Sequence, residues 1–353
     1  MAKIMVVIFY VSAIIVSLCL GLFILNYFLG SYDYETNVHE ISVDFSSISI
    51  HDDTDNITFL PSEDGKVKVV CHEKKIDKHS VLTENGTLKI SRNNSKKWFQ
   101  YIDFGLNFKE KSITVYLNES EYSLLFIDSS TGDISISEGF KFDSVEISLS
   151  TGDVSCLSSA ENVIKIKGST GSVNLKNASA NAIEVSVSTG DVSLSGIDCT
   201  KLNLKATSGK IHLSDVNAEK VNVETSTGDI TASSVSASND ISLSLTTGKI
   251  KLNDLSCANL CAVADTGDIK LTSVISSNNI SITTDTGDVT LEECDGSQIH
   301  VKTDTGSVKG TLLTPKQFIT KTSTGKIKVP DFESGGVCKI TTSTGNIEIS
   351  VKE

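Results

Sequence analysis

Five aspartates in the second half of the chain are the residues whose type and spacing best suit a metal ion. They are Asp265, Asp268, Asp285, Asp288 and Asp304, in runs of Asp-Thr-Gly-Asp or Asp-Thr-Gly-Ser spaced nineteen or twenty residues apart. Oxygen ligands of this kind suit Ca²⁺, so carboxylates stacked on neighbouring turns of the chain could hold one. The same acids recur with the repeat, however, as residues of a structural corner do. The pattern therefore favours a corner, with Ca²⁺ as the one cofactor that remains an alternative.

The region around these acids offers little for catalysis. Residues 126–353 contain no tryptophan, tyrosine or arginine, and their histidines are His212 and His300. Neither histidine has a Ser or Cys nucleophile that the sequence places beside it. A glycan-active β-helix would need paired acids that depart from the repeat. We predict no catalytic residues and no enzymatic activity, and retain a glycan-active enzyme as an alternative.

An aromatic cluster stands earlier in the chain, flanked by lysines. Its members are Trp98, Phe99, Tyr101, Phe104 and Phe108. Large apolar groups are what a solenoid needs to cover its open end, which favours a cap. The alternative is a contact patch for lipid or a partner protein.

These candidates are positioned by an internal repeat. The dipeptide Thr-Gly, once Ser-Gly, occurs twelve times at a spacing of nineteen or twenty residues. Glycine permits the left-handed backbone of a sharp turn, and a Ser or Asp two residues earlier can accept a backbone N–H there. The repeat predicts one structural corner per unit, at Gly132, Gly152, Gly171, Gly190, Gly209, Gly228, Gly248, Gly267, Gly287, Gly306, Gly325 and Gly345.

Between the glycines, apolar residues alternate with polar ones. After Gly209, for example, Ile211 and Leu213 are followed by a second alternating run from Val221 to Thr225. A period of two indicates strands, and a unit of about nineteen residues indicates one turn of a solenoid. A single turn cannot bury its apolar side chains, whereas stacked turns can. We predict an all-β single-stranded parallel β-helix (β-solenoid) with coils of 19–20 residues.

The residue after each corner glycine carries a charge in most units. From the fourth to the eighth unit the order is Asp191, Lys210, Asp229, Lys249 and Asp268. Residues in register on adjacent coils would lie about 4.8 Å apart, where opposite charges pair. The alternation predicts a ladder that is electrically neutral.

The charge and arginine content of the chain limit the kinds of partner that it can bind. The net charge is −13 and the chain has a single arginine, Arg92, so a basic nucleic-acid footprint is absent and bidentate clamps are not expected. Five of the eight cysteines fall in inward positions of the repeat, which predicts buried thiols and no disulfides: Cys156, Cys199, Cys257, Cys294 and Cys338.

The chain begins with an apolar segment, residues 4–29, which is long enough to span a bilayer. Lys3 precedes the segment and acids follow it, so we expect a cytoplasmic amino terminus and an extracytoplasmic solenoid. A cleaved signal peptide is the alternative. We thus predict a single-pass cell-membrane protein whose anchor lies in the lipid bilayer.

Three regions follow from this organisation. Residues 1–30 form a short cytoplasmic start and a transmembrane signal-anchor, residues 31–125 form degenerate first coils and an amino-terminal cap, and residues 126–353 form the regular solenoid. The carboxyl end, Val351 to Glu353, shows no cap, so we expect the last coil in sequence to present an open edge.

Units such as Gly209 to Ala218, followed by Val221 to Ile230, resemble those of the bacterial "putative adhesin" β-strand-repeat family, over about residues 38–353. The resemblance implies a parallel β-helix with a role in surface interaction or envelope-stress signalling, and it supplies no catalytic residues. We predict a non-catalytic binding or scaffolding surface at the cell envelope, with a protein or cell-surface partner. The alternative is an accessory or sensor protein of an envelope-stress system.

Overall fold

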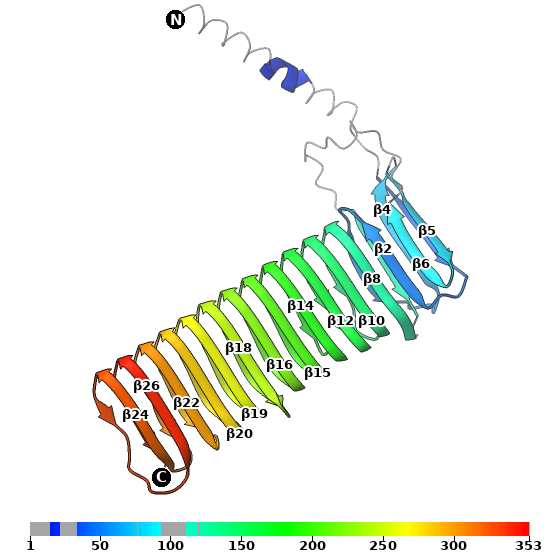
Figure 1. Ribbon diagram of the computed structural model, residues 1–353. Coiled ribbons are helices and arrows are strands. Elements are labelled where there is room, and N and C mark those ends of the chain that lie inside the picture. Colours follow the sequence, from blue (N-terminus) through cyan, green and yellow to red (C-terminus); the bar gives the residue numbers. More distant parts are fainter. Residues whose placement is uncertain (1–14, 22–33, 76, 93–110, 119–120, 353) are drawn as a thin grey trace, which may run out of the picture.

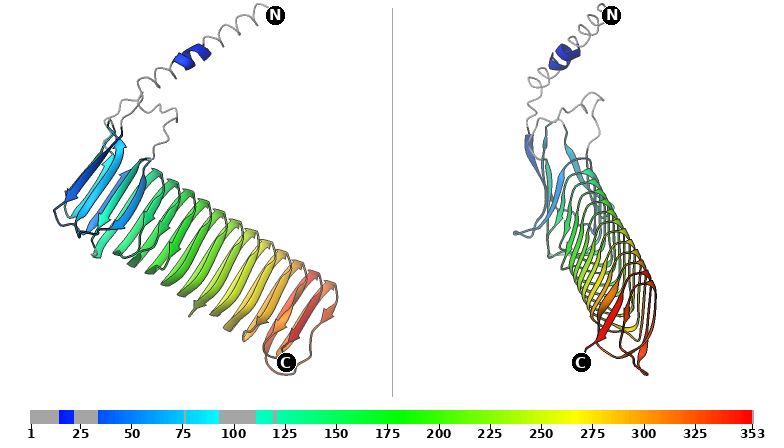
Figure 2. Two further views of the ribbon diagram at one scale, coloured as in Figure 1. Left: turned by 180° about the vertical axis from the view of Figure 1, so that it is seen from behind. Right: turned by 90° about the vertical axis from the view of Figure 1, so that its left-hand side faces the viewer.

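The computed structural model describes residues 15–21, 34–75, 77–92, 111–118 and 121–352. Its β-structure is a long, flattened solenoid in which strands from successive coils lie side by side along one axis (Figure 1). Viewed from the side, two layers of strands face one another across a narrow interior (Figure 2). The predicted β-solenoid is therefore confirmed.

The described residues form 27 strands. In chain order they are β1 (Tyr34–Ile41), β2 (Ser47–Asp52), β3 (Asn56–Pro61), β4 (Val67–Lys74), β5 (His79–Glu84), β6 (Thr87–Arg92), β7 (Ser112–Leu117), β8 (Glu121–Thr131), β9 (Ile134–Ile136), β10 (Lys141–Thr151), β11 (Val154–Cys156), β12 (Ser159–Thr170), β13 (Val173–Lys176), β14 (Ser179–Thr189), β15 (Val192–Ser208), β16 (Ile211–Thr227), β17 (Ile230–Ala237), β18 (Asp240–Thr247), β19 (Ile250–Thr266), β20 (Ile269–Thr286), β21 (Val289–Cys294), β22 (Gln298–Thr305), β23 (Val308–Leu312), β24 (Lys316–Thr324), β25 (Ile327–Lys328), β26 (Gly336–Thr344) and β27 (Ile347–Val351).

The interior is built from the alternating apolar residues. In β16, Ile211, Leu213, Val221 and Val223 are fully buried, while their immediate neighbours in sequence, such as His212 and Asn222, are exposed or half-buried. Each pairs in parallel register with its equivalent one coil away; Ile211, for example, lies between Val192 and Ile230. The inward side chains of an interior coil are thus covered from both sides by neighbouring coils, which is how stability accumulates along a solenoid.

The twelve corner glycines form a column. Their φ angles lie between 116° and 159°, a region that residues with a side chain rarely adopt. At Gly209 an added Cβ would lie 2.0 Å from the carbonyl oxygen of Gly190 on the adjacent coil. Glycine is therefore required both by the backbone conformation and by the close approach of the next coil.

The seven coils from Gly171 to Gly287 also have a second bend, six residues after the glycine, which the repeat pattern did not predict. Asn177, Asp215, Ser234 and Asp254 have φ between 53° and 57° there, and Gly196 has φ 64°. Asn, Asp and Gly tolerate this left-handed conformation better than other residues. Asn, Asp and Gly at this position were the available signal for a left-handed residue. Ser and Glu occur there in other coils and make that signal weaker.

The order of coils in space differs from their order in sequence at the carboxyl end. β26 pairs with β22 on one side and β24 on the other, and β27 likewise lies between β23 and β25. The expectation that the last coil in sequence presents the open edge is wrong. That coil is inserted, and the outermost strands are β24 and β25, which precede it in the chain (Figure 1).

The amino-terminal end shows a similar insertion. β2 lies between β6 and β8, and β3 lies between β7 and β9, all in parallel. Beyond them β5 pairs with β6, and β4 pairs with both β7 and β1, in antiparallel register. These antiparallel strands end the parallel ladder on this side and hold the polar residues described below.

Two predicted features fall on other parts of the chain. The aromatic cluster Trp98, Phe99, Tyr101, Phe104 and Phe108 lies outside the described residues, as does most of the predicted membrane segment. Of that segment, residues 15–21 are described as helix. Among the described residues, no helix combines the length and apolar character that a membrane span requires.

Candidate functional site

The regular part of the solenoid carries a long surface depression, which we call the axial groove. It consists of two adjoining cavities of about 610 and 470 Å³ that extend from Glu121 to Ser238 and share Ala160, Glu161 and Ser179. The groove crosses seven successive coils, so at a strand spacing of ~4.8 Å its length is about 29 Å. This matches an extended ligand of about nine residues.

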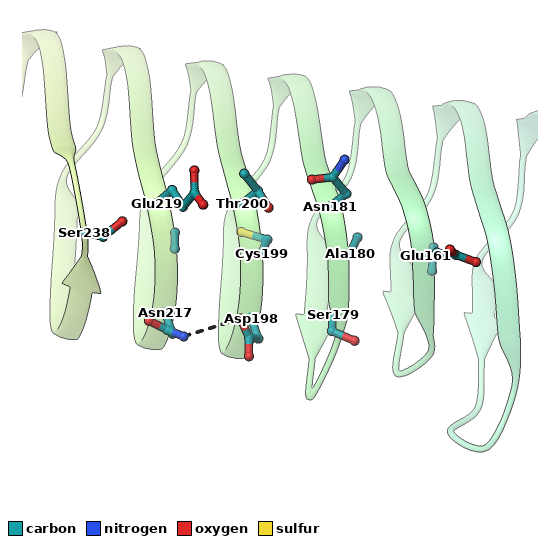
Figure 3. Close-up of a pocket in the computed structure, with 12 residues that line it drawn as sticks. Glu161, Ser179, Ala180, Asn181, Asp198, Cys199, Thr200, Asn217, Glu219 and Ser238 are labelled. Carbon is teal, nitrogen blue, oxygen red and sulfur yellow. Dashed lines mark hydrogen bonds between the residues drawn. The ribbon is translucent and has the colours of Figure 1, made fainter.

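Short side chains at one position of the repeat create the groove. Nine residues after the corner glycine stand Ala180, Cys199 and Ala218, each only 6–7% exposed. Figure 3 shows polar side chains from successive coils in two rows beside this floor: Ser179, Asp198 and Asn217 in one, and Asn181, Thr200 and Glu219 in the other. From Ala160 onward a small residue recurs there, so the floor continues along the axis, whereas Tyr122 and Phe142 occupy the equivalent position on the first two coils of the groove.

The groove is acidic. Its lining holds one amine, Lys141, and six carboxylates: Glu121, Glu138, Asp143, Glu161, Asp198 and Glu219. Lys141 Nζ lies 3.9 Å from Glu121. The excess of negative charge favours a cationic ligand over an anionic one.

The groove also lacks an activated nucleophile. Burial, followed by the nearby Asp198 charge, raises the pKa of the Cys199 thiol to about 12, so the group is neutral at physiological pH. No histidine stands among the residues that line the groove. The arrangement suits binding, and nothing in its lining activates a group for covalent chemistry.

A second site, the charge cluster, lies at the amino-terminal end of the solenoid. It consists of Asp52, Asp55, Glu73, Asp77, His79 and Arg92, whose side chains are at most 5% exposed. Asp52 ends β2, and its Oδ2 accepts the backbone N–H groups of Thr54 and Asp55. This turn replaces the Thr-Gly corner in the first coil and so aims two carboxylates inward.

Arg92 is the centre of the charge cluster. Its guanidinium donates to Asp52 Oδ1 at 2.8 Å, to Asp55 Oδ1 at 2.5 Å and to Asp77 Oδ2 at 2.6 Å. The low arginine content made bidentate clamps unexpected, and Arg92 instead contacts one oxygen of each of three carboxylates. That lone arginine in a chain with 44 acids was the available signal.

His79 links the remaining acids. Its Nδ1 lies 2.6 Å from Glu73 Oε2 and its Nε2 3.0 Å from Asp52 Oδ1. Burial lowers the pKa of His79, but the hydrogen bond to Asp52 and the surrounding charges outweigh that effect and raise the pKa to about 10. Burial likewise opposes ionisation of Asp52, yet His79 and Arg92 hold the pKa of Asp52 well below its usual range. Burial and the neighbouring Asp52 charge raise the pKa of Asp55.

The five aspartates considered for calcium lie at the corners of successive coils. Asp268 Oδ1 accepts the backbone N–H of Asp288, and Asp288 Oδ1 accepts that of Ser307. Among the described residues, the groups of three or more possible ligands within 4.8 Å of one another include none of the five. Calcium binding by these residues stays the alternative to a purely structural corner.

The acid after each glycine has a structural contact that the sequence reasoning did not assign. In coil after coil its carboxylate accepts the backbone N–H of the equivalent residue on the next coil, as Asp191 does from Lys210 and Asp229 from Lys249. Lys249 Nζ also lies 2.9 Å from Asp268 Oδ2, the pairing that the alternating ladder predicts. The acceptor expected two residues before the glycine is therefore found one residue after it.

All eight cysteines, each within the described residues, are free thiols. The five predicted to point inward are buried, as are the apolar residues that surround them. Cys71 is also buried, but it lies beside the charge cluster.

Comparison with solved structures gives several distant likenesses. A "putative adhesin" from Parabacteroides merdae ATCC 43184 is 15% identical, with 80% of this chain and 97% of that chain covered and a TM-score of 0.39. A "putative adhesin" from Bacteroides fragilis NCTC 9343 is 16% identical, with 91% and 98% covered and a TM-score of 0.30. A "putative lipid binding protein" from Parabacteroides distasonis ATCC 8503 is 15% identical, with 90% and 98% covered and a TM-score of 0.32.

No curated protein matches the chain. One family does, described as Toastrack DUF4097, over residues 45–239 and 236–353. These two matches together span almost all of the β-solenoid, and the resemblance to bacterial β-repeat proteins expected from the sequence is confirmed. The chain therefore belongs to the Toastrack DUF4097 family.

Proposed function

We propose that this protein is a non-catalytic binding rod of the cell envelope, and that its axial groove holds an extended peptide segment rich in lysine or arginine. The observation that carries the proposal is the groove itself, which is long, open and lined by six carboxylates and one amine. A linear cationic chain can place successive charges beside carboxylates on successive coils. The glycan-active alternative finds no support in the lining, which has no activated nucleophile or histidine.

The groove can be tested by reversing its charge. We expect the triple variant Glu161→Lys, Asp198→Lys, Glu219→Lys to bind a fluorescent nonalysine peptide at least about tenfold more weakly than the unaltered chain at low salt, because three attractive contacts become repulsive. All three side chains are exposed, so the fold should tolerate the change. Fluorescence anisotropy measures the affinity.

The matched control introduces the same three acid-to-lysine changes outside the groove. Asp265→Lys, Asp285→Lys, Asp304→Lys alters three exposed corner acids outside the groove and gives the same net charge. This control should keep most of the affinity. If both triple variants lose affinity equally, the peptide responds to net charge and the groove is not its site.

The membrane segment completes the proposal, since residues 4–29 would fix the rod to the bilayer with the solenoid on the extracytoplasmic side. We expect the full chain to stay in the membrane fraction after washing with high salt and carbonate, and a chain that begins at residue 34 to be released. A full chain recovered in the soluble fraction would refute the anchor.

Crosslinking from Thr200 in native membranes would distinguish a surface ligand from the membrane-protein partner that an accessory or sensor role requires.

A further inference from the structure

The charge cluster adjoins three side chains whose chemistry is that of a metal site. Cys71, Glu73 and His79 are all buried, and each offers a ligand atom that lies within 4.8 Å of the other two. Cys71 and Glu73 point the same way because they are two residues apart on β4, and His79 begins β5. The strand period and the short β4–β5 connection thus bring thiol, carboxylate and imidazole together.

Cys71 differs in this respect from the cysteines of the regular coils. Cys156, for example, is enclosed by apolar residues of the solenoid interior, where only packing accounts for it. Cys71 belongs to the same buried core, but it also has a histidine and a glutamate beside it. A buried thiol with such neighbours is unusual in a core position and typical of a coordination shell.

We propose that Cys71, Glu73 and His79 bind a zinc ion that fixes β4 and β5 to the end of the solenoid. Zinc accepts sulfur, nitrogen and oxygen ligands together, which calcium and magnesium do not. Glu73 Oε1 accepts the Asn37 side-chain amide at 2.6 Å, so Oε2, which faces His79, is the donor from Glu73, and the three side chains supply three donors. Arg92 already holds Asp52, Asp55 and Asp77, which leaves the zinc site on the opposite side of His79.

The surroundings of His79 fit this role. A histidine that binds zinc through one ring nitrogen usually donates the N–H of the other to a carboxylate, which fixes the ring. His79 Nε2 lies 3.0 Å from Asp52 Oδ1, while Nδ1 lies beside Glu73. Nδ1 is therefore the metal-binding nitrogen, and Asp52 is the positioning residue.

Charge balance is preserved when the ion binds. Zinc brings two positive charges, and two protons leave, one from the Cys71 thiol and one from Nδ1 of the imidazolium. The total charge inside the cluster is unchanged, so Arg92 and its three carboxylates keep their pairing.

The site is buried, so the metal must be loaded as the chain folds. We expect the full chain, produced in zinc-supplemented medium and purified in detergent, to retain about one zinc per chain after dialysis against a weak chelator. Cys71→Ser should reduce the retained zinc at least tenfold. Cys156→Ser, which alters a buried thiol away from the cluster, should retain as much as the unaltered chain.

A second readout keeps the proposal testable if Cys71→Ser folds poorly. Chain produced in cobalt-supplemented medium should show the near-ultraviolet absorption of a cobalt–thiolate bond, because cobalt takes the same tetrahedral ligands. No retained zinc and no such absorption in the unaltered chain would overturn the site. Equal zinc in Cys71→Ser and the unaltered chain would overturn it as well.

Discussion

Replacing Gly209 by alanine is expected to destabilise the solenoid by about 3 kcal/mol or more, because two separate costs coincide at this corner. The backbone has φ 148°, which alanine rarely adopts, and the new Cβ would lie 2.0 Å from the carbonyl oxygen of Gly190. That oxygen is part of the backbone of the preceding coil, so it cannot move without disturbing the parallel ladder. Guanidinium unfolding followed by circular dichroism measures the loss.

A glycine without a close neighbour gives the matched control. Gly65 has φ 71° and no atom within 4 Å of an added Cβ, so Gly65→Ala carries only the conformational cost of about 1–2 kcal/mol. The difference between the two variants reports the close approach of adjacent coils together with the higher conformational cost at φ 148° than at φ 71°. A loss at Gly209 no larger than that at Gly65 would contradict the tight stacking of the glycine column.

The regular coils were predictable because the residues that specify each coil lie close together in sequence and recur in every unit. Ile211, Leu213, Val221 and Val223 are buried as the two-residue period requires, and the glycine spacing fixes the register of one coil on the next. A one-residue slip would turn these side chains to solvent, so the hydrophobic pattern and the corner specify the same answer.

The same similarity of the units made the order of the coils at the carboxyl end unpredictable. β24 and β26 carry similar alternating patterns and the same Thr-Gly corner, so nothing local decides which of them lies against β22. The choice depends on the connection of residues 329–335, which lets the last coil return between two others. When the units of a repeat are similar, the sequence does not specify which of two distant units lies against a given strand.

The charge cluster escaped prediction because its members come from separate strands. Asp52, Glu73, His79 and Arg92 belong to β2, β4, β5 and β6, which become neighbours only through the inserted and antiparallel arrangement of this end. The axial groove was missed for another reason. The alternating pattern assigns Cys199 of the floor to the interior, but a short side chain at that position also leaves a hollow outside.

Replacing Arg92 by methionine should cost about 3–5 kcal/mol, because it leaves the carboxylates of Asp52, Asp55 and Asp77 buried without their shared cation. The control is Lys249→Met, which removes an ion pair of similar length, 2.9 Å to Asp268, between side chains that are about half exposed. Solvent screens that pair, so its loss should lower the unfolding free energy far less than Arg92→Met does. Unfolding in denaturant at neutral pH measures both.

The pH dependence of the Arg92→Met effect identifies its cause. The depressed pKa of Asp52 stabilises the unaltered protein above the unfolded value of about 3.9, and that contribution is lost as the pH falls. The raised pKa of His79 contributes below about 6.5 and is lost as the pH rises through about 10. Protonated carboxyls need no cation, so the gap in unfolding free energy between Arg92→Met and the unaltered chain should narrow on acidification. A gap that stays constant down to the lowest pH at which the chain remains folded would mean that Arg92 acts through packing of its side chain and not through its charge.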